Sequence, residues 1–397
     1  MALSARAFSV IPHASYYASC WQCEGCCWSL QSIAPKQQLS NRPKALRSLN
    51  RARKCKIFDE LEISRNFFVK ATLATGMLYC ASALAETSTE HASQNDMLQE
   101  LEMLPYKREG YNYWMWRGHK VHYVVKGEGR PVVLIHGFGA STFHWRYNIP
   151  ELAKHFKVYA MDLLGFGLSE KALIDYNPFV WRDQVADFVQ EIVAKPAVLV
   201  GNSIGGFTVL LTAAAFPQLT SGLVLLNASG QFEVPDEQKK PVIQETALQR
   251  LVITPLITWA RRWAILFTFW QAKQPSRIRS VLNNVYVDRT NVDDNLVQSI
   301  VTPAQEPNAA EVYYRMMTQF LSRPSDITLN KLLAELSCPL MLLWGDLDPW
   351  MGATKAEKIK QLYDKTLLVR LQAGHCPHDE APKEANQALV DWISSLV

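Results

Sequence analysis

The sequence has few cysteines beyond its first 80 residues. Six of the eight, Cys20, Cys23, Cys26, Cys27, Cys55 and Cys80, lie in that region, which leaves only Cys338 and Cys376 in the rest of the chain. Two cysteines cannot supply a disulfide framework, so we expect both to be reduced thiols. The first four cysteines are tightly spaced and lack the second, distant ligand pair of a zinc finger. We therefore expect no metal site.

Acidic residues are almost absent from the first 57 residues. This part has nine Lys or Arg residues and one acid, Glu24, so it carries a net charge of +8. Because the whole chain carries +4, the remainder carries −4. Arg- and Ser-rich, acid-poor N-termini are typical of organelle transit peptides. We predict that residues 1–57 are a transit peptide, and that the net positive charge of the chain reflects import and not nucleic-acid binding.

The sequence also has no obvious membrane-spanning run before its folded part. The apolar stretch ATLATGMLYCASALA, residues 71–85, has 15 residues, whereas a spanning helix needs roughly 20. It resembles the apolar region and small-residue cleavage site of a secretory or thylakoid-lumen signal, and the alternative is a mildly apolar part of a leader that extends to residue 85. We expect residues 86–112 to be a linker, and residues 113–397 to form the folded domain.

A serine lies between two glycines where an apolar strand is expected to turn into a helix. The run AVLVGNSIGG, residues 197–206, places Ser203 between Gly201 and Gly205, and a helix-compatible segment follows until Pro217. This pattern is typical of a nucleophile elbow, in which a strained turn exposes the seryl hydroxyl. Since a five-residue pattern of this kind also arises by chance, the assignment needs further motifs.

Three further motifs follow predicted strands. Residues 132–135 lead into His136, Gly137, Phe138 and Gly139, a turn that can direct a backbone N–H into a cavity. We expect the amides of Phe138 and Ile204 to form an oxyanion hole. Residues 340–343 lead to Asp346 and Asp348, and residues 367–371 lead to His375. The order Ser203, Asp348, His375 is the order of the triad in α/β-hydrolases.

The wider pattern predicts an α/β fold with eight strands. They are expected at residues 113–116, 120–125, 132–135, 158–161, 198–201, 223–226, 340–343 and 367–371. Helix-compatible segments separate most of them, which implies a mostly parallel sheet with helices on both faces. The first two strands are too close for a crossover helix, so we expect an antiparallel hairpin at one edge. About 110 predominantly helical residues, 228–337, interrupt the alternation and are expected to be an inserted lid.

The lid contains an aromatic stripe. Trp259, Trp263, Phe267 and Trp270 are spaced by four, four and three residues and therefore share one helical face. Three interpretations remain open: the stripe packs the lid onto the main domain, it lines a pocket for a hydrocarbon chain, or it rests on a membrane. Nearby Lys and Arg side chains suit anionic headgroups or a solvated face equally well.

Residues from about 113 to 397 resemble the α/β-hydrolase superfamily. The phrases HGFGASTFHWRYNIPEL, DLLGFGLSEK, GNSIGG, NVDDNLV, LLWGDLDPW and GHCPHDE are similar to those of plant chloroplast hydrolases of the pheophytinase and chlorophyll dephytylase group. The resemblance implies the α/β-hydrolase fold and a location in the chloroplast, either the stroma or the thylakoid surface in preference to the lumen. It also places the triad carboxylate at Asp348 in preference to Asp346. His378 is the rival of His375 as the base.

These observations predict a serine carboxylic-ester hydrolase with the triad Ser203, His375 and Asp348, which needs no cofactor. The expected partner is a lipophilic ester, and the resemblance implies the phytyl ester of chlorophyll or pheophytin. The alternatives are a plastid lipase, acyl esterase or thioesterase. An alternative of another class is a ligand receptor that retains a triad. Plant hormone sensors of that kind usually have histidine before the serine, where this chain has Asn202.

Overall fold

The computed structural model describes residues 101–233, 254–321 and 327–396. The predictions for a transit peptide at residues 1–57, for its extension to residue 85 and for the cysteines there lie outside the described residues. Of the predicted linker, residues 101–112 are described. In this part Leu104 is buried, and its amide donates a hydrogen bond to the carbonyl of Arg146.

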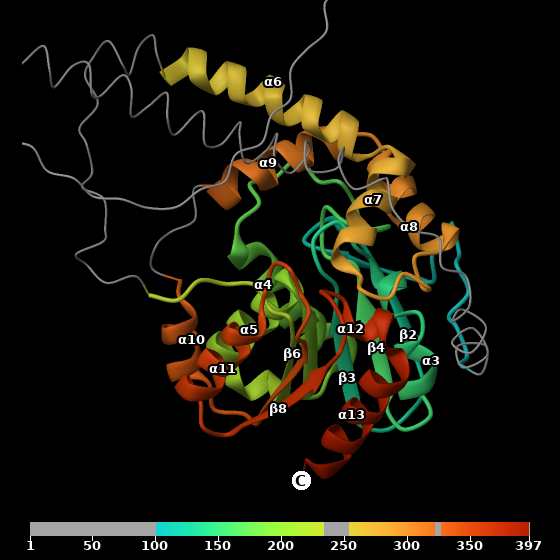
Figure 1. Cartoon of the computed structure of the whole chain (residues 1–397), viewed down its shortest axis with the longest axis vertical. Coiled ribbons are helices and arrows are strands. Elements are labelled where there is room, and N and C mark those ends of the chain that lie inside the picture. Colours follow the sequence, from blue (N-terminus) through green and yellow to red (C-terminus); the bar gives the residue numbers. More distant parts are fainter. Residues whose placement is uncertain (1–100, 234–253, 322–326, 397) are drawn as a thin grey trace, which may run out of the picture. The chain divides into compact units, whose positions relative to one another are not determined.

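An eight-stranded sheet forms the centre of the described part (Figure 1). Its strands are β1 (Asn112–Trp116), β2 (His119–Lys126), β3 (Pro131–Ile135), β4 (Lys157–Met161), β5 (Ala197–Asn202), β6 (Thr220–Leu226), β7 (Leu340–Gly345) and β8 (Thr366–Leu371). Their spatial order is β1-β2-β4-β3-β5-β6-β7-β8, antiparallel where β2 meets β1 and β4 and parallel elsewhere. The eight predicted strands and the edge hairpin are confirmed.

Helices cover both faces of the sheet, as predicted. The central strands β3, β5 and β7 are buried along their whole length, which explains their continuous apolar runs. One face packs against α3 (Asn148–Leu152) and α13 (Pro382–Ser395). The other face packs against α4 (Pro178–Phe188), which continues as η2 (Val189–Val193), and against α5 (Ile204–Ala215), α10 (Leu329–Glu335) and α11 (Ala353–Leu362).

Among the described residues between β6 and β7, four helices form the inserted lid, and α10, which also lies there, packs on the sheet. The four lid helices are α6 (Thr254–Ala272), α7 (Pro275–Val285), α8 (Asp294–Ala304) and α9 (Ala309–Leu321). Residues of α7 and α8 share a small apolar cluster with Cys376 of the main body. Figure 1 shows α6 as the outermost lid helix, with α9 beneath it. The lid therefore joins the body beside the segment that follows β8.

The interpretation that the aromatic stripe packs the lid onto the main domain is wrong. The side chains of Trp259, Trp263, Phe267 and Trp270 are 61%, 57%, 60% and 52% exposed, respectively. The buried residues of α6 are Ile265 and Phe269, on the opposite face. Periodicity alone identifies a shared face but does not say which neighbour, if any, that face meets.

Among the helices that the structure describes, none has the length and apolar character to cross a membrane.

Candidate active site

Ser203 lies on a strained turn between β5 and α5. Its φ is +56° and its ψ is −117°, a conformation that costs free energy for any residue with a side chain. The surrounding backbone holds this turn: the Ser203 amide donates to the carbonyl of Leu226, and the Ser203 carbonyl accepts from the amides of Phe207 and Ser229.

The two glycines that flank Ser203 are required by close backbone contacts. A Cβ on Gly201 would lie 2.4 Å from the carbonyl oxygen of Gly205. A Cβ on Gly205 would lie 2.4 Å from the carbonyl oxygens of both Ile135 and His136. Neither contact is sterically allowed, so the G-x-S-x-G pattern here is a packing requirement of the turn.

His375 and Asp348 form a buried hydrogen-bonded pair. His375 Nδ1 lies 2.6 Å from Asp348 Oδ2, and each residue is 5% exposed. Asn227 Nδ2 also donates to Asp348 Oδ2 at 2.8 Å, and the Trp350 amide donates to Oδ1 at 2.7 Å. Burial alone would raise the pKa of Asp348, but the hydrogen bond and charge of His375, with the amide donors, lower it below its usual value. Asp348 is therefore a carboxylate suited to orient the imidazole.

Asp346 and His378, the rival candidates for the triad acid and base, lie outside the cavity that contains Ser203. Asp346 Oδ2 forms an ion pair with Arg370 at 3.0 Å. His378 is 1% exposed and stacks on Trp145, with ring centroids 4.0 Å apart. Neither rival lines the cavity that contains Ser203 and His375. The structure thus pairs His375 with Asp348, the second of the two candidate aspartates.

A cavity of about 330 Å³ lies between the lid and the carboxyl ends of the strands. Ser203, His375 and Phe138 line it from the body. Most of its lid lining is apolar and comes from Phe269, Ala272, Ile278, Val281, Leu282, Val285, Ile300, Pro303, Ala304, Ala309, Val312, Tyr313 and Met316. Pockets of this volume accommodate small organic ligands. The arrangement presents a serine and a histidine to an apolar ligand.

The two residues expected to form an oxyanion hole are Phe138, in the turn after β3, and Ile204, which directly follows Ser203. Phe138 lines the cavity in the turn after β3. Ile204 is the first residue of α5, where backbone amides have no partner within the helix. His136 orients the turn: its Nδ1 lies 2.7 Å from the Gly137 carbonyl, and its Nε2 accepts from the Leu163 amide at 3.0 Å.

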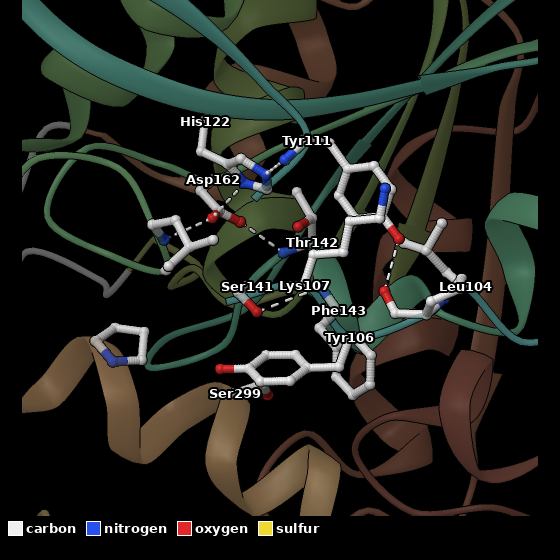
Figure 2. Close-up of a pocket in the computed structure, with 14 residues that line it drawn as sticks. Leu104, Tyr106, Lys107, Tyr111, His122, Ser141, Thr142, Phe143, Asp162 and Ser299 are labelled. Carbon is white, nitrogen blue, oxygen red and sulfur yellow. Dashed lines mark hydrogen bonds and ion pairs between the residues drawn. The ribbon is translucent and has the colours of Figure 1, made fainter. Parts of the chain in front are cut away.

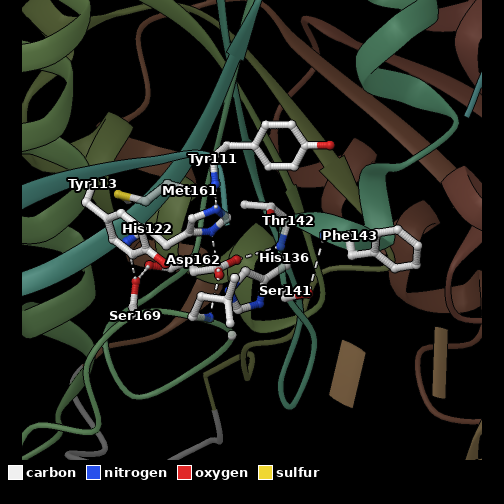
Figure 3. A network of polar contacts seen from close by, with 12 residues as sticks. Tyr111, Tyr113, His122, His136, Ser141, Thr142, Phe143, Met161, Asp162 and Ser169 are labelled. Atoms are coloured by element: carbon white, nitrogen blue, oxygen red, sulfur yellow. Dashed lines mark hydrogen bonds and ion pairs between the residues drawn. The ribbon is translucent and has the colours of Figure 1, made fainter. Parts of the chain in front are cut away.

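A second buried His–Asp pair lies near this turn (Figure 3). His122 Nδ1 lies 2.9 Å from Asp162 Oδ2, but the Tyr111 amide donates to His122 Nε2 at 3.0 Å. Both ring nitrogens of His122 are thus engaged in hydrogen bonds within the fold. Asp162 also accepts from the amides of Thr142 and Leu168. The pair therefore joins β2, the end of β4 and the loop after β3, and it is structural.

The space around this second pair is also too small for a substrate. Figure 2 shows His122 and Asp162 beside Ser141 and Tyr106, which line a pocket of about 20 Å³. That volume suffices for a single water molecule. Burial opposes ionisation of Asp162, but the charge and hydrogen bond of His122 and the amide donors lower its pKa to about 2.

Sequence reasoning missed three polar residues that hold the site together. Asn202 donates to the carbonyl of His375 at 2.9 Å, and Asn227 donates to the carboxylate of Asp348. Glu380 accepts from the amide of Gly374, next to His375. The available signal was position: Asn202 and Asn227 stand at the carboxyl ends of two neighbouring parallel strands, the edge at which α/β sheets bind ligands.

Lys171 connects the body to the lid at the cavity wall. Its ammonium donates to the carbonyls of Gly167 and Ser169 and pairs with Glu306 at 3.2 Å. Its hydrogen-bonding capacity is therefore used within the protein.

Within the described residues, no three His, Cys, Asp or Glu side chains are grouped so as to hold a metal ion.

A mostly parallel sheet with a serine on a strained strand-to-helix turn and a His–Asp pair beside it defines the α/β-hydrolase class. The model of the alpha/beta hydrolase fold family matches residues 130–382, and the chain belongs to that family. It is a hydrolase, and it resembles pheophytinase.

Two relatives and one solved structure illustrate the similarity. The chloroplastic pheophytinase of Arabidopsis thaliana is 29% identical over 333 residues, which cover 73% of this chain and 67% of that protein. A 2-hydroxy-6-oxo-6-(2'-aminophenyl)hexa-2,4-dienoic acid hydrolase of Metapseudomonas resinovorans is 26% identical over 282 residues, covering 70% and 88%. The crystal structure of a serine hydrolase involved in carbazole degradation superposes with a TM-score of 0.58 at 23% identity, covering 71% and 98%.

Proposed function

We propose that the protein is a serine hydrolase of carboxylic esters, with Ser203 as nucleophile, His375 as base and Asp348 as the residue that orients His375. The observation that carries this proposal is the 2.6 Å contact between His375 and Asp348, next to a strained Ser203 in an apolar cavity. A serine hydroxyl is a weak nucleophile until a positioned base accepts its proton.

The mechanism follows from these positions. His375 accepts the proton of Ser203 while the seryl oxygen attacks the ester carbonyl. The amides of Phe138 and Ile204 donate to the developing oxyanion. His375 then protonates the departing alcohol, which leaves an acyl-enzyme, and a water activated by the same imidazole releases the acid. Asp348 stays ionised and stabilises the imidazolium.

We further propose a lipophilic ester as substrate, with the phytyl ester of chlorophyll or of its magnesium-free derivative as the first choice. Two observations support it: the lid side of the cavity is lined largely by apolar side chains, and the chain is similar to a chloroplastic pheophytinase. The same similarity and the basic, acid-poor first 57 residues support a chloroplast location.

The test incubates the purified full chain with chlorophyll a, pheophytin a, acyl esters of increasing chain length and an acyl thioester. Freed phytol and acid are measured by chromatography. We expect release of phytol, and loss of at least about 10⁴-fold in kcat for Ser203→Ala. The matched control is Ser221→Ala, an exposed serine on β6, which should keep full activity. Turnover of acyl esters or the thioester alone would reject the phytyl-ester assignment.

The number of turnovers separates an enzyme from a receptor that retains a triad. An enzyme forms product far in excess of its own concentration. Product that stops near one equivalent of protein would contradict the proposal and favour the receptor.

A further inference from the structure

The outer face of the lid is an exposed aromatic surface. Leu256 lies on the same helical face as the stripe of Trp259, Trp263, Phe267 and Trp270, and it is 64% exposed. These five side chains occupy the length of α6 on the side opposite Ile265 and Phe269. Single exposed apolar residues are ordinary, but contiguous apolar surfaces mark interaction sites.

The surroundings of this surface are basic. The two helices α6 and α7, residues 254–285, contain five Lys or Arg residues and no Asp or Glu. Arg262 pairs with Glu311, and Arg279 pairs with Asp294. Arg261, which is exposed, and Arg277 have no ion-pair partner among the described residues. A helix pair that carries an aromatic face and a net positive charge is complementary to an anionic lipid surface.

The same helix also borders the candidate active site. On its inner side, Phe269, Ala272 and Lys273 line the cavity that contains Ser203. From α7, Val281 lines the cavity and is also 48% exposed. One helix therefore has an exposed aromatic surface on one side and an apolar cavity on the other. A bilayer bound to the outer side would lie next to the cavity.

We propose that α6 docks the protein on a lipid bilayer that carries anionic headgroups. The helix lies in the plane of the interface, with the stripe among the upper acyl chains and headgroups, and the net positive charge of α6 and α7 attracts the anionic headgroups. Trp favours this depth because its indole combines apolar area with an N–H that can face water, and Phe and Leu add apolar area to the buried face of such a helix. The proposal concerns binding and does not depend on which ester is hydrolysed.

The test measures sedimentation of the full chain with phosphatidylcholine vesicles that contain either no anionic lipid or about 30% phosphatidylglycerol. We expect binding to the anionic vesicles, a weakening with salt, and a blue shift of tryptophan fluorescence on binding. The triple variant Trp259→Ser, Trp263→Ser, Phe267→Ser should lose at least about tenfold in affinity for these vesicles. The double variant Arg261→Gln, Arg277→Gln should weaken binding to anionic vesicles and leave binding to neutral vesicles unchanged.

A matched control replaces three exposed apolar residues outside α6: Met115→Ser, Leu173→Ser and Leu367→Ser. It should bind vesicles as the wild type does. Circular dichroism and thermal unfolding verify that each variant is folded. Equal binding by the wild type and a folded stripe variant would overturn the proposal. So would a wild-type dimer that dissociates in the stripe variant without any change in vesicle binding, because the stripe would then meet a second copy.

Discussion

At the scale of single residues, Asp346 and Asp348 are both aspartates after β7, but their partners differ. Asp348 accepts hydrogen bonds from His375, Asn227 and the Trp350 amide, whereas Asp346 pairs with Arg370 near the surface. A carboxylate can orient an imidazole only when it accepts from the ring N–H. The two residues therefore have different partners, although they lie two positions apart.

We expect Asp348→Asn to reduce kcat by about 10⁴-fold, because an amide no longer selects the Nδ1–H tautomer of His375. Steady-state hydrolysis of the ester that the full chain turns over fastest measures the effect. The matched variant Asp346→Asn should leave kcat nearly unchanged. A large loss in Asp346→Asn with activity retained in Asp348→Asn would reverse the assignment.

At the scale of elements, Glu380 ties the lid to the loop that contains His375. One carboxylate oxygen accepts from the amides of Val287 and Asp288, just after α7, and the other accepts from the Gly374 amide. The His375 amide also donates to the Val285 carbonyl at 2.9 Å. The end of α7 and the histidine loop are thus held by shared backbone contacts.

We predict that Glu380→Gln lowers kcat by about 10- to 100-fold, because small displacements of a catalytic group carry costs of this size. A glutamine can keep one acceptor oxygen toward the lid, but its NH₂ group then faces the Gly374 amide, donor against donor. Thermal unfolding should show a loss of about 1.5–3 kcal/mol. Glu384→Gln, at an exposed position on α13, is the control and should match the wild type in both measurements. Unchanged kcat in Glu380→Gln would show that the hydrogen bonds of Glu380 do not position His375.

At the scale of the whole molecule, buried histidines make the folded state sensitive to acid. Burial lowers the pKa of His136, lowers that of His144 to about 3, and places that of His378 well below its usual value. The unfolded chain binds protons at these histidines below pH about 6.5, and the folded chain does not. The free energy of unfolding therefore falls as the pH falls below that value.

Two buried acids act in the opposite sense. Burial raises the pKa of Asp379 to about 6 and also raises that of Glu380. Between about pH 6 and 4 the folded protein binds protons at these acids that the unfolded chain does not bind, so their contribution to stability rises as the pH falls. The three buried histidines lower the free energy of unfolding in acid, and the two buried acids raise it. Because the histidines are more numerous, we expect the free energy of unfolding to fall on balance as the pH falls.

We expect His378→Phe to reduce the loss of stability between pH 6 and pH 5 by about 1.2 kcal/mol. Neither ring nitrogen of His378 has a hydrogen-bond partner among the described residues, and the ring stacks on Trp145, so phenylalanine keeps the packing. Urea unfolding at several pH values measures how steeply the free energy of unfolding falls as the pH falls. His155→Gln, an exposed histidine, should keep the slope of the wild type. An unchanged slope in His378→Phe would mean that His378 is protonated in the folded protein.

The sequence by itself determined the strands, the elbow and the chain order of Ser203, then the candidate pair Asp346 and Asp348, then His375. These features depend on local apolar runs and on glycines whose Cβ atoms would meet backbone, as at Gly201 and Gly205. The edge hairpin was predictable for the same reason, since a two-residue connection between β1 and β2 excludes a crossover.

Only the tertiary structure decided which aspartate meets His375, that His122 and Asp162 form a structural pair, and that the stripe on α6 faces outward. Each depends on side chains brought together from distant segments, or on a face left without a neighbour. Periodicity and spacing describe one segment at a time. Packing then selects the partner of each side chain, because a buried polar group needs a hydrogen bond and an apolar face needs cover.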